Sequence, residues 1–299
     1  MTPLVSAIVP VYNADRFLAE ALDSALAQTL RNIEIVVVDD GSTDTSGAIA
    51  ERYAADHPER VRVIHQANAG LVPARNAAVA IARGRYLALL DADDVWLPGH
   101  LAESVNALEQ DASIGLVHAN VRFIDSGSRV YGEVPKRVWR IGDDAFIEIL
   151  LRRRNVACPT AVFRRSVIDE VGTFDPVFNR LGCEDRDLWL RIAKVSGLRY
   201  IDAVHAHYRT HDANMSSRID KMQRARLLLV ERYTGGNRGL RRRAVAAVHN
   251  SSGDELLYAG DRLPAFVAYL RALAWCPGMR KAWWGVACCL LRWRRSASG

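Results

Sequence analysis

The sequence lacks the features that mark several common protein classes. Its five cysteines are odd in number, contain no Cys-x-x-Cys and have no ligand-like spacing, so neither a disulfide framework nor a zinc site is indicated. No run of about 18 uninterrupted apolar residues occurs. The N-terminus also lacks the basic segment and the long apolar stretch of a signal peptide. We therefore expect a reduced, cytoplasmic protein without a membrane-spanning helix.

Two glycine-rich phosphate-binding motifs are also missing. The chain contains no Gly-x-Gly-x-x-Gly, typical of dinucleotide-binding folds. It contains no Gly-x-x-x-x-Gly-Lys-Ser/Thr, typical of P-loop proteins. A dinucleotide or Walker-type site is therefore excluded, and any nucleotide site must use other residues.

Positive charge is concentrated in the last quarter of the chain. The 299 residues carry a net charge of +6 and are 49% hydrophobic, enough for one large core or one main domain with an appendage. Residues 220–299 hold 15 Lys and Arg against 5 Asp and Glu, whereas residues 1–219 hold 25 against 29. We therefore predict two domains, 1–219 and 220–299, the second a basic, amphipathic helical region.

The composition of that second region leaves two kinds of partner open. Tryptophans, leucines and clustered arginines are most dense in "LPAFVAYLRALAWCPGMRKAWWGVACCLLRWRR". Such helices suit an anionic membrane surface, here the cytoplasmic leaflet. They equally suit a helical subdomain that packs on the core or forms a homodimer.

Strand and helix patterns alternate along the first hundred residues. Near-continuous apolar runs predict strands, and stretches of about a dozen residues between them predict helices. This alternation predicts an α/β fold with a mostly parallel central sheet covered by helices on both faces. The predicted strands are 6–12, 33–40, 61–66 and 86–90, and the predicted helices are 14–28, 44–56 and 70–83.

Polar side chains follow three of these strands. They are Tyr12-Asn13, Asp39-Asp40 and the Asp91-Ala-Asp93 of "YLALLDADDVW". Ligands of parallel α/β sheets bind beyond the carboxyl ends of the strands, so the three motifs are expected at one edge. Their convergence predicts a binding site there.

The chemistry of these residues suits a nucleotide and a divalent cation. Asp91, Asp93 and the adjacent Asp94 repel one another, and Mg²⁺ or Mn²⁺ would offset that charge; a helix N-terminal cluster is the alternative. Asp40 could accept the imide N–H of a uracil or thymine or an N–H of guanine, or simply belong to a turn with a cap. The Tyr12 ring offers a stacking surface for a base. Arg75, early in the third helix, could bind a diphosphate or the base region.

Four segments together resemble the family-2 glycosyltransferases, which have the nucleotide-sugar-binding GT-A fold. They are "VSAIVPVYNADRFLAEALDSALAQT", "EIVVVDDGSTD", "NAGLVPARNAAVAIARGRYLALLDADD" and "CEDRDLWLRIA". The resemblance covers about residues 4–215, in the family's order and spacing. It implies a GT-A catalytic domain over residues 1–219.

The resemblance also implies roles in binding the nucleotide sugar. Pro10, Tyr12 and Asn13 match the first-strand nucleotide-binding segment, with Tyr12 near the base. Asp40 matches the position that reads the base. Arg75 matches the family's arginine near the nucleotide.

The remaining assignments concern the metal and the chemistry. By the same resemblance, Asp91 lies near the ribose and Asp93 binds the metal that bridges the diphosphate. His211, in a segment similar to the family's loop over the diphosphate, is a second metal residue. Asp185 matches the catalytic base, and Asp187 is expected on the helix surface.

The resemblance implies a metal-dependent, inverting, hexosyltransferase-like enzyme using Mn²⁺ or Mg²⁺. The donor is expected to be a nucleotide-diphosphate sugar, UDP favoured, with dTDP or GDP as alternatives. The acceptor is expected to be a glycan or lipid-linked molecule of bacterial surface polysaccharide synthesis, handled in the cytoplasm or at the inner face of the membrane. No nucleic acid partner is implied.

The residues also bear on two other functional classes. A sugar-nucleotide pyrophosphorylase would need a glycine-rich loop and an activating lysine after Val5, and neither is present. A non-catalytic nucleotide-sugar-binding or scaffold protein remains the alternative. The presence of both Asp93 and Asp185 favours the enzyme.

Overall fold

The computed structural model describes residues 2–132, 144–211 and 218–291. Its internal contacts divide the chain into two compact units. Unit 1 comprises Met1–Arg140, Val156–Arg180 and Glu184–Asp212, and unit 2 comprises Ile141–Asn155, Leu181–Cys183 and Ala213–Gly299. The domain boundary between residues 219 and 220 stays a prediction.

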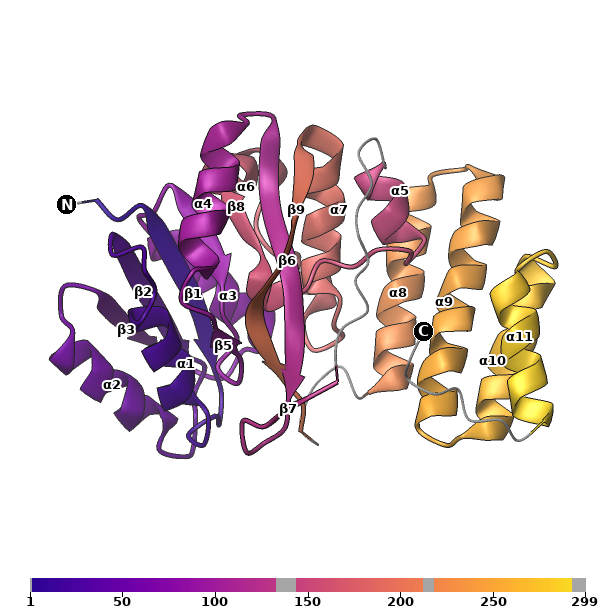
Figure 1. Cartoon of the computed structure of the whole chain (residues 1–299), viewed down its shortest axis with the longest axis horizontal. Helices are drawn as coiled ribbons and strands as arrows, with labels where there is room; N and C mark the ends of the chain where they lie inside the picture. The colour runs from indigo at the N-terminus through magenta and orange to yellow at the C-terminus, as the bar shows by residue number, and fades with distance from the viewer. Residues whose placement is uncertain (1, 133–143, 212–217, 292–299) are drawn as a thin grey trace. The chain divides into compact units, whose positions relative to one another are not determined.

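Four parallel strands form one half of the sheet of unit 1. They are β1 (Val5–Val11), β2 (Ile33–Asp39), β3 (Val61–His65) and β4 (Tyr86–Leu89), in the order β3-β2-β1-β4 (Figure 1). Val5 of the central strand pairs with Ile33 on one side and with Tyr86 on the other. Every residue of β1, β2 and β4 is buried, which explains their near-continuous apolar sequences.

The other half of the sheet mixes orientations. The order continues as β8, β6, β9 and β5, and β7 pairs with β6 off this path. β8 is antiparallel to β4 and β6, whereas the long β6–β9 ladder is parallel. The bounds are β5 (Val95–Trp96), β6 (Ile114–Ile124), β7 (Val130–Tyr131), β8 (Val162–Arg164) and β9 (Gly197–Arg209).

Helices cover both faces of this sheet. Leu18 and Leu22 of α1 and Leu108 of α4 share a core with Val5 and Val9, which point to one face of β1. The buried residues of α3 are outside that core, and α3 packs on β1 and β2 from the opposite side. The helices of unit 1 are α1 (Leu18–Leu26), α2 (Ser46–Asp56), α3 (Leu71–Ile81), α4 (His100–Gln110), α6 (Arg165–Val171) and α7 (Glu184–Val195).

These features confirm the predicted α/β class, with a mostly parallel sheet and a C-terminal helical region. Helix α1 begins at Leu18, later than the predicted residue 14, because residues 15–17 form a turn. Of β9, only His205 and His207 were expected to be strand or packing residues. Two short 3₁₀ helices, Cys158–Thr160 and Pro176–Phe178, connect elements near the ends of the parallel strands.

Unit 2 is helical. It contains α5 (Ala145–Leu150), α8 (Ile219–Thr234), α9 (Arg238–Tyr258), α10 (Arg262–Trp275) and α11 (Arg280–Leu290). The break between α8 and α9 coincides with Gly235, in the left-handed region with φ 37°, and with Asn237, whose side chain caps α9 by accepting from Leu240 N at 2.9 Å. Within the described residues, no helix has both the length and the apolar content that crossing a bilayer requires.

Close packing of α9, α10 and α11 is centred on one aromatic ring. Tyr269 of α10 is fully buried, and its hydroxyl donates to Asp254 Oδ1 at 2.8 Å. Gly253 and Gly285 face this ring, and a Cβ on Gly253 would lie 2.7 Å from it. The glycines therefore let the helices approach each other where any side chain would collide.

Candidate active site at the strand ends

The ends of β1, β2 and β4 lie side by side. The three strands are adjacent and parallel, so the residues that follow them share one edge of the sheet. Tyr12, Asp40 and Asp91 are therefore brought to a common edge. Residues far apart in sequence meet there for a purely topological reason.

The segment after β1 is tied to the segment after β2. Asn13 has a left-handed φ of 49°, and its side-chain oxygen accepts from Thr43 N at 2.8 Å. Its backbone N–H donates to Ser42 Oγ at 3.0 Å. Tyr12 is 52% exposed, whereas Pro10 is buried within β1. Of the predicted nucleotide-binding segment, Tyr12 offers the accessible ring and Asn13 holds the turn.

Asp40 organises the loop that leads into α3. Its carboxylate accepts from Gln66 Nε2 at 2.6 Å, from Ala69 N at 2.8 Å and from Gly70 N at 2.8 Å. A carboxylate has roughly four acceptor positions, so these three bonds leave room for about one further donor. Asp40 is buried, and its position is fixed by its own loop.

Arg75 joins the acidic turn after β4 to the start of α7. Its Nη2 donates to Asp91 Oδ1 and its Nη1 to Glu184 Oε1, each at 2.6 Å. The same Nη2 lies 3.4 Å from Cys158 Sγ, and the guanidinium covers the ring of Phe174 at 5.4 Å. Burial acts to lower the pKa of Arg75, but the anionic neighbours, Asp91 first, raise it well above its usual value. Arg75 therefore stays charged as a buried bridge between two carboxylates.

The first two residues of α7 have different surroundings. Burial raises the pKa of Glu184 to about 7; the Arg75 guanidinium opposes this shift and the Asp185 carboxylate adds to it. Asp185 is partly exposed, and its Oδ1 accepts from the N–H of Arg186 at 2.6 Å. Glu184 thus points into the protein, and Asp185 is the carboxylate accessible at the helix start.

The prediction for Asp187 was wrong. Expected on the surface of the helix, it is fully buried, and its Oδ2 accepts from Arg191 Nε at 2.9 Å. Arg191 in turn donates to the carbonyl oxygens of Val171, Gly172 and Thr173. Asp187 therefore anchors α7 to the segment that follows α6.

The acidic turn after β4 contacts the end of β9. Asp93 Oδ2 lies 3.0 Å from Nε2 of His211, and Asp94 Oδ1 accepts from Arg209 N at 2.8 Å. Burial, followed by the charge of Asp91, raises the pKa of Asp93. Burial raises the pKa of Asp94 well above its usual value, and the two neighbouring carboxylates add to the shift. The repulsion expected from the sequence is therefore present at this turn.

The donor set of this turn fits a divalent cation. Asp93 and His211 place a carboxylate oxygen beside an imidazole nitrogen, and both atom types are ligands of Mn²⁺. Within the described ranges, no group of three or more His, Cys, Asp or Glu residues is arranged to hold a metal ion. Two protein ligands are sufficient for a cation whose other coordination positions are filled by water and by phosphate oxygens.

Arg209 is a site residue that the sequence did not single out. It is buried, its Nε donates to the carbonyl oxygen of Asp93 at 2.7 Å, and its Nη2 donates to Glu20 at 2.6 Å. Its guanidinium also lies 4.7 Å from the ring of Phe17, which contacts His211 at 5.1 Å. Its position two residues before His211 was the only sign of this role in the sequence. The partners of Arg209 are distant along the chain, so sequence patterns could not identify them.

The segment 205–216, which resembles the family's loop over the diphosphate, begins as a strand in the structure. Residues 205–209 belong to β9, and residues 212–217 lie outside the described residues. His205 is buried against His100, with their Nδ1 atoms 3.2 Å apart. His205 therefore packs inside the protein, as expected for a strand or packing residue.

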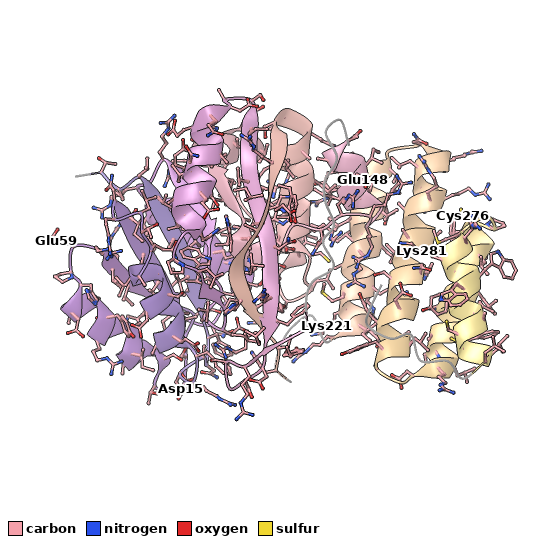
Figure 2. The ribbon with its side chains drawn as sticks, viewed as in Figure 1. Asp15, Glu59, Glu148, Lys221, Cys276 and Lys281 are labelled. Carbon is pink, nitrogen blue, oxygen red and sulfur yellow. The ribbon has the colours of Figure 1, made fainter. Side chains whose placement is uncertain are left out.

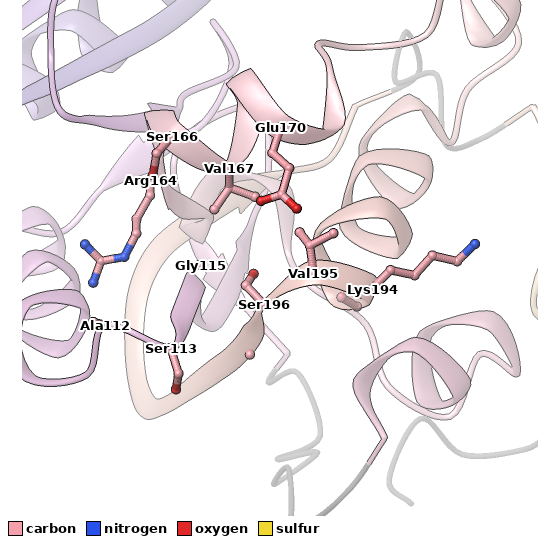
Figure 3. Close-up of a pocket in the computed structure, with 12 residues that line it drawn as sticks. Ala112, Ser113, Gly115, Arg164, Ser166, Val167, Glu170, Lys194, Val195 and Ser196 are labelled. Carbon is pink, nitrogen blue, oxygen red and sulfur yellow. The ribbon is translucent and has the colours of Figure 1, made fainter.

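A hollow of about 570 Å³ lies at the opposite edge of the sheet (Figure 3). It is lined by the starts of β6 and β9 and by parts of α6 and α7, including Gly115, Glu170, Lys194 and Ser196. Arg164 at its rim already donates to the carbonyl oxygen of Ile114 at 2.9 Å. None of the predicted site residues lines this hollow, so it is separate from the strand-end site.

Several curated proteins are similar to this chain. An uncharacterized glycosyltransferase of Nostoc sp. is 34% identical over 214 residues, covering 70% of this chain and 66% of that protein. The putative glycosyltransferase EpsH of Bacillus subtilis is 30% identical over 223 residues, covering 74% and 64%. The uncharacterized glycosyltransferase EpsJ of the same organism is 55% identical over 94 residues, covering 31% and 27%. The chain thus spans about two thirds or less of the length of these relatives.

Solved structures share the fold at low sequence identity. S. aureus TarS 1–349 in complex with UDP-GlcNAc is 16% identical, with a TM-score of 0.64, covering 96% of this chain and 92% of that one. The mannosyltransferase PcManGT from Pyrobaculum calidifontis, in complex with GDP-Man and Mn²⁺, is 20% identical with a TM-score of 0.64, covering 98% and 82%. The profile of the family described as glycosyl transferase family 2 matches residues 6–172, more than half of the chain. The chain therefore belongs to glycosyl transferase family 2 and has the GT-A fold.

Proposed function

We propose that this chain is a metal-dependent, inverting glycosyltransferase. The observation that carries the proposal is the double ion pair of Arg75, which holds Asp91 after β4 and Glu184 at the start of α7. This bridge ties the acidic turn to the helix that presents Asp185. Family membership supports the reaction class, and the complexes of the structural neighbours with UDP-GlcNAc and GDP-Man support a nucleotide-sugar donor.

The donor's nucleotide binds at the ends of β1 and β2. In this proposal the exposed ring of Tyr12 stacks on the base, and Asp40 accepts an N–H from the base edge. Asn13 and Pro10 set the conformation of the first turn, and Asp91 lies near the ribose. A pyrimidine fits a single carboxylate acceptor beside an aromatic ring, so UDP is favoured, with dTDP and GDP as alternatives.

Asp93 and His211 would hold Mn²⁺ or Mg²⁺ beside the donor's diphosphate. When bound, the cation supplies positive charge that stabilises the departing diphosphate. The mutual repulsion of the carboxylates at this turn supports a cationic partner. A neighbour with Mn²⁺ bound has the same fold, which supports this choice of ion.

Asp185 acts as the general base. It accepts the proton of the acceptor hydroxyl while that oxygen forms a bond to the anomeric carbon of the sugar. The bond from that carbon to the diphosphate oxygen breaks, and its electron pair leaves with the nucleoside diphosphate. Attack opposite the leaving group inverts the anomeric configuration.

The test combines donor binding with turnover. A thermal-shift screen of UDP-, dTDP- and GDP-sugars with Mn²⁺ identifies the donor, and hydrolysis of that donor measures turnover. Asp185→Asn is expected to keep donor binding and lose about a hundredfold or more of turnover, as loss of a general base does. Asp169→Asn, on the exposed side of α6, is the matched control. Unchanged turnover in Asp185→Asn would mean that another group is the base.

The identity of the acceptor, the pathway and the location stay predictions. A glycan or lipid-linked acceptor of bacterial surface polysaccharide synthesis, handled in the cytoplasm, rests on the family resemblance and not on a contact in this site.

A further inference from the structure

The last two described helices have an unusual charge composition. From Arg262 to Leu291 the sequence contains four basic residues and no Asp or Glu. Helix α11 begins with Arg280 and Lys281, and neither α10 nor α11 has an acidic residue in its first turn. At the start of α11, Arg280 and Lys281 oppose the helix dipole, so helix stability does not explain them, whereas Arg262 of α10 follows the N-cap residue Asp261.

Helix α10 has apolar residues on two opposite faces. Ala265, Tyr269 and Ala272 are buried against α9 and α11. Leu263, Val267 and Leu270, spaced by four and three residues, form a second stripe, and Leu263 is 74% exposed. Of these two stripes, the first is the one that is buried among the described residues of unit 2.

Helix α11 repeats this pattern. Ala282, Gly285 and Cys288 are buried, whereas Trp283 is 56% and Leu290 67% exposed. Trp283 is held in place, because its Nε1 donates to the carbonyl oxygen of Pro277 at 2.8 Å. Arg280 precedes Trp283 by three residues and thus shares its face. Lys281, in the same first turn, is labelled in Figure 2.

We propose that the outer stripes of α10 and α11 bind the surface of an anionic lipid bilayer, and that the exposed Arg262, Arg271, Arg280 and Lys281 supply the positive charge of these helices. Exposed tryptophan and leucine side chains enter the boundary between headgroups and acyl chains, and the basic side chains contact lipid phosphates. Helices of 14 and 11 residues are too short to cross a bilayer and lie in its surface.

A second copy of this chain fits the same surface less well. A symmetric dimer would place the same surface of both copies against each other. Both copies of this surface would then carry the same four basic side chains, and neither copy has an acidic residue between 262 and 291. Like charges brought together oppose association, whereas anionic lipids neutralise them.

The experiment measures sedimentation of the full chain with vesicles of phosphatidylglycerol and phosphatidylcholine, or of phosphatidylcholine alone. We expect binding to the anionic vesicles that weakens between 0.1 and 0.5 M NaCl, together with a blue shift of tryptophan fluorescence. Arg280→Gln with Lys281→Gln is expected to weaken the partition roughly thirtyfold. Leu263→Gln with Leu270→Gln removes part of the apolar contribution and is expected to weaken binding at all salt concentrations.

Controls separate this surface from general effects. Val177→Ser, at an exposed apolar position of unit 1, is expected to bind like the wild type, and circular dichroism checks that each variant is folded. No sedimentation at 0.1 M NaCl, or equal binding to neutral vesicles, overturns the proposal. A wild-type dimer in light scattering that Leu263→Gln with Leu270→Gln makes monomeric also overturns it, in favour of self-association. These readouts need no substrate, so they are independent of the proposed enzymatic function.

Discussion

The guanidinium of Arg75 lies 2.6 Å from Oε1 of Glu184, although 109 residues separate the two in sequence. One belongs to α3 and the other begins α7, so this contact fixes the second helix to the first. The other terminal nitrogen of Arg75 holds Asp91 at the same distance. The relative positions of the strand-end acids and the start of α7 thus depend on one side chain.

Replacing that side chain is expected to impair catalysis more than donor binding. In Arg75→Lys a single ammonium cannot hold both carboxylates, so Glu184 and Asp185 lose their fixed position relative to the donor. We expect kcat to fall about a hundredfold, with little change in KM for the donor. Arg83→Lys, at a half-exposed arginine outside the site, is the control. A large rise in donor KM at normal kcat would instead assign Arg75 to nucleotide binding, as the sequence suggested.

Removing His211 is expected to weaken the response to Mn²⁺. In His211→Ala, Asp93 loses its partner at 3.0 Å, and the cation would lose one protein ligand. The Mn²⁺ concentration for half-maximal thermal stabilisation, measured with the nucleoside diphosphate, should rise by at least the roughly tenfold that losing a residue supporting a metal ligand costs. His57→Ala, at an exposed histidine, should leave it unchanged. Equal Mn²⁺ responses in both variants would remove His211 from the metal site.

Acid is expected to destabilise the protein through its buried histidines. Burial lowers the pKa of His118 to about 3, and burial also lowers the pKa of His100 well below 6.5. In the unfolded chain both have a pKa near 6.5. Below that pH the unfolded state takes up protons that the folded state does not, so stability is lost as pH falls through 6.5 towards 3. One such histidine accounts for about 2 kcal/mol between pH 6.5 and pH 5.

Urea unfolding at several pH values between 7 and 5 measures this loss. In His118→Leu the free energy of unfolding should fall less steeply with decreasing pH than in the wild type, because the unfolded variant binds about one proton fewer. His57→Leu, at an exposed position, should keep the wild-type slope. The same slope in all three proteins would show that His118 is protonated in the folded state.

The contact between α10 and α11 is expected to tolerate no side chain at residue 285. A Cβ on Gly285 would overlap the ring of the buried Tyr269, so Gly285→Ala should lower the free energy of unfolding of unit 2 by about 1–3 kcal/mol. Gly278→Ala is the matched control, since no atom lies within 4 Å of its Cβ position. Thermal unfolding followed by circular dichroism compares the two. Equal stability would mean that the helices can separate at this point.

The sequence predicted the first half of the fold well because its signals are local. Continuous apolar runs identify β1, β2 and β4, whose residues are all buried. The strand β9 gave no such signal. It is only partly buried, and its pairing with β6 shifts register near Ala119 and Asn120, so neither alternation nor a continuous apolar run results.

The site residues also differ in whether the sequence could predict their positions. Topology alone brings Tyr12, Asp40 and Asp91 to one edge, and strand prediction was sufficient to find it. The ion pairs of Arg75 and the burial of Asp187 could not be predicted, because their partners come from other elements. Spacing within a helix shows which residues share a face, but not what packs against that face.

The pairing of β5 with β9 has a consequence for folding. Trp96 of β5 pairs with Ala206 of β9. β5 is therefore synthesised early, but it can pair with β9 only after more than a third of the chain has followed it. Asp93 lies just before β5 and His211 just after β9, and they meet only when this last ladder closes. Contacts of such long sequence separation form slowly. The acidic turn is therefore completed late, and a nascent chain that ends before β9 has three crowded carboxylates but not the histidine beside them.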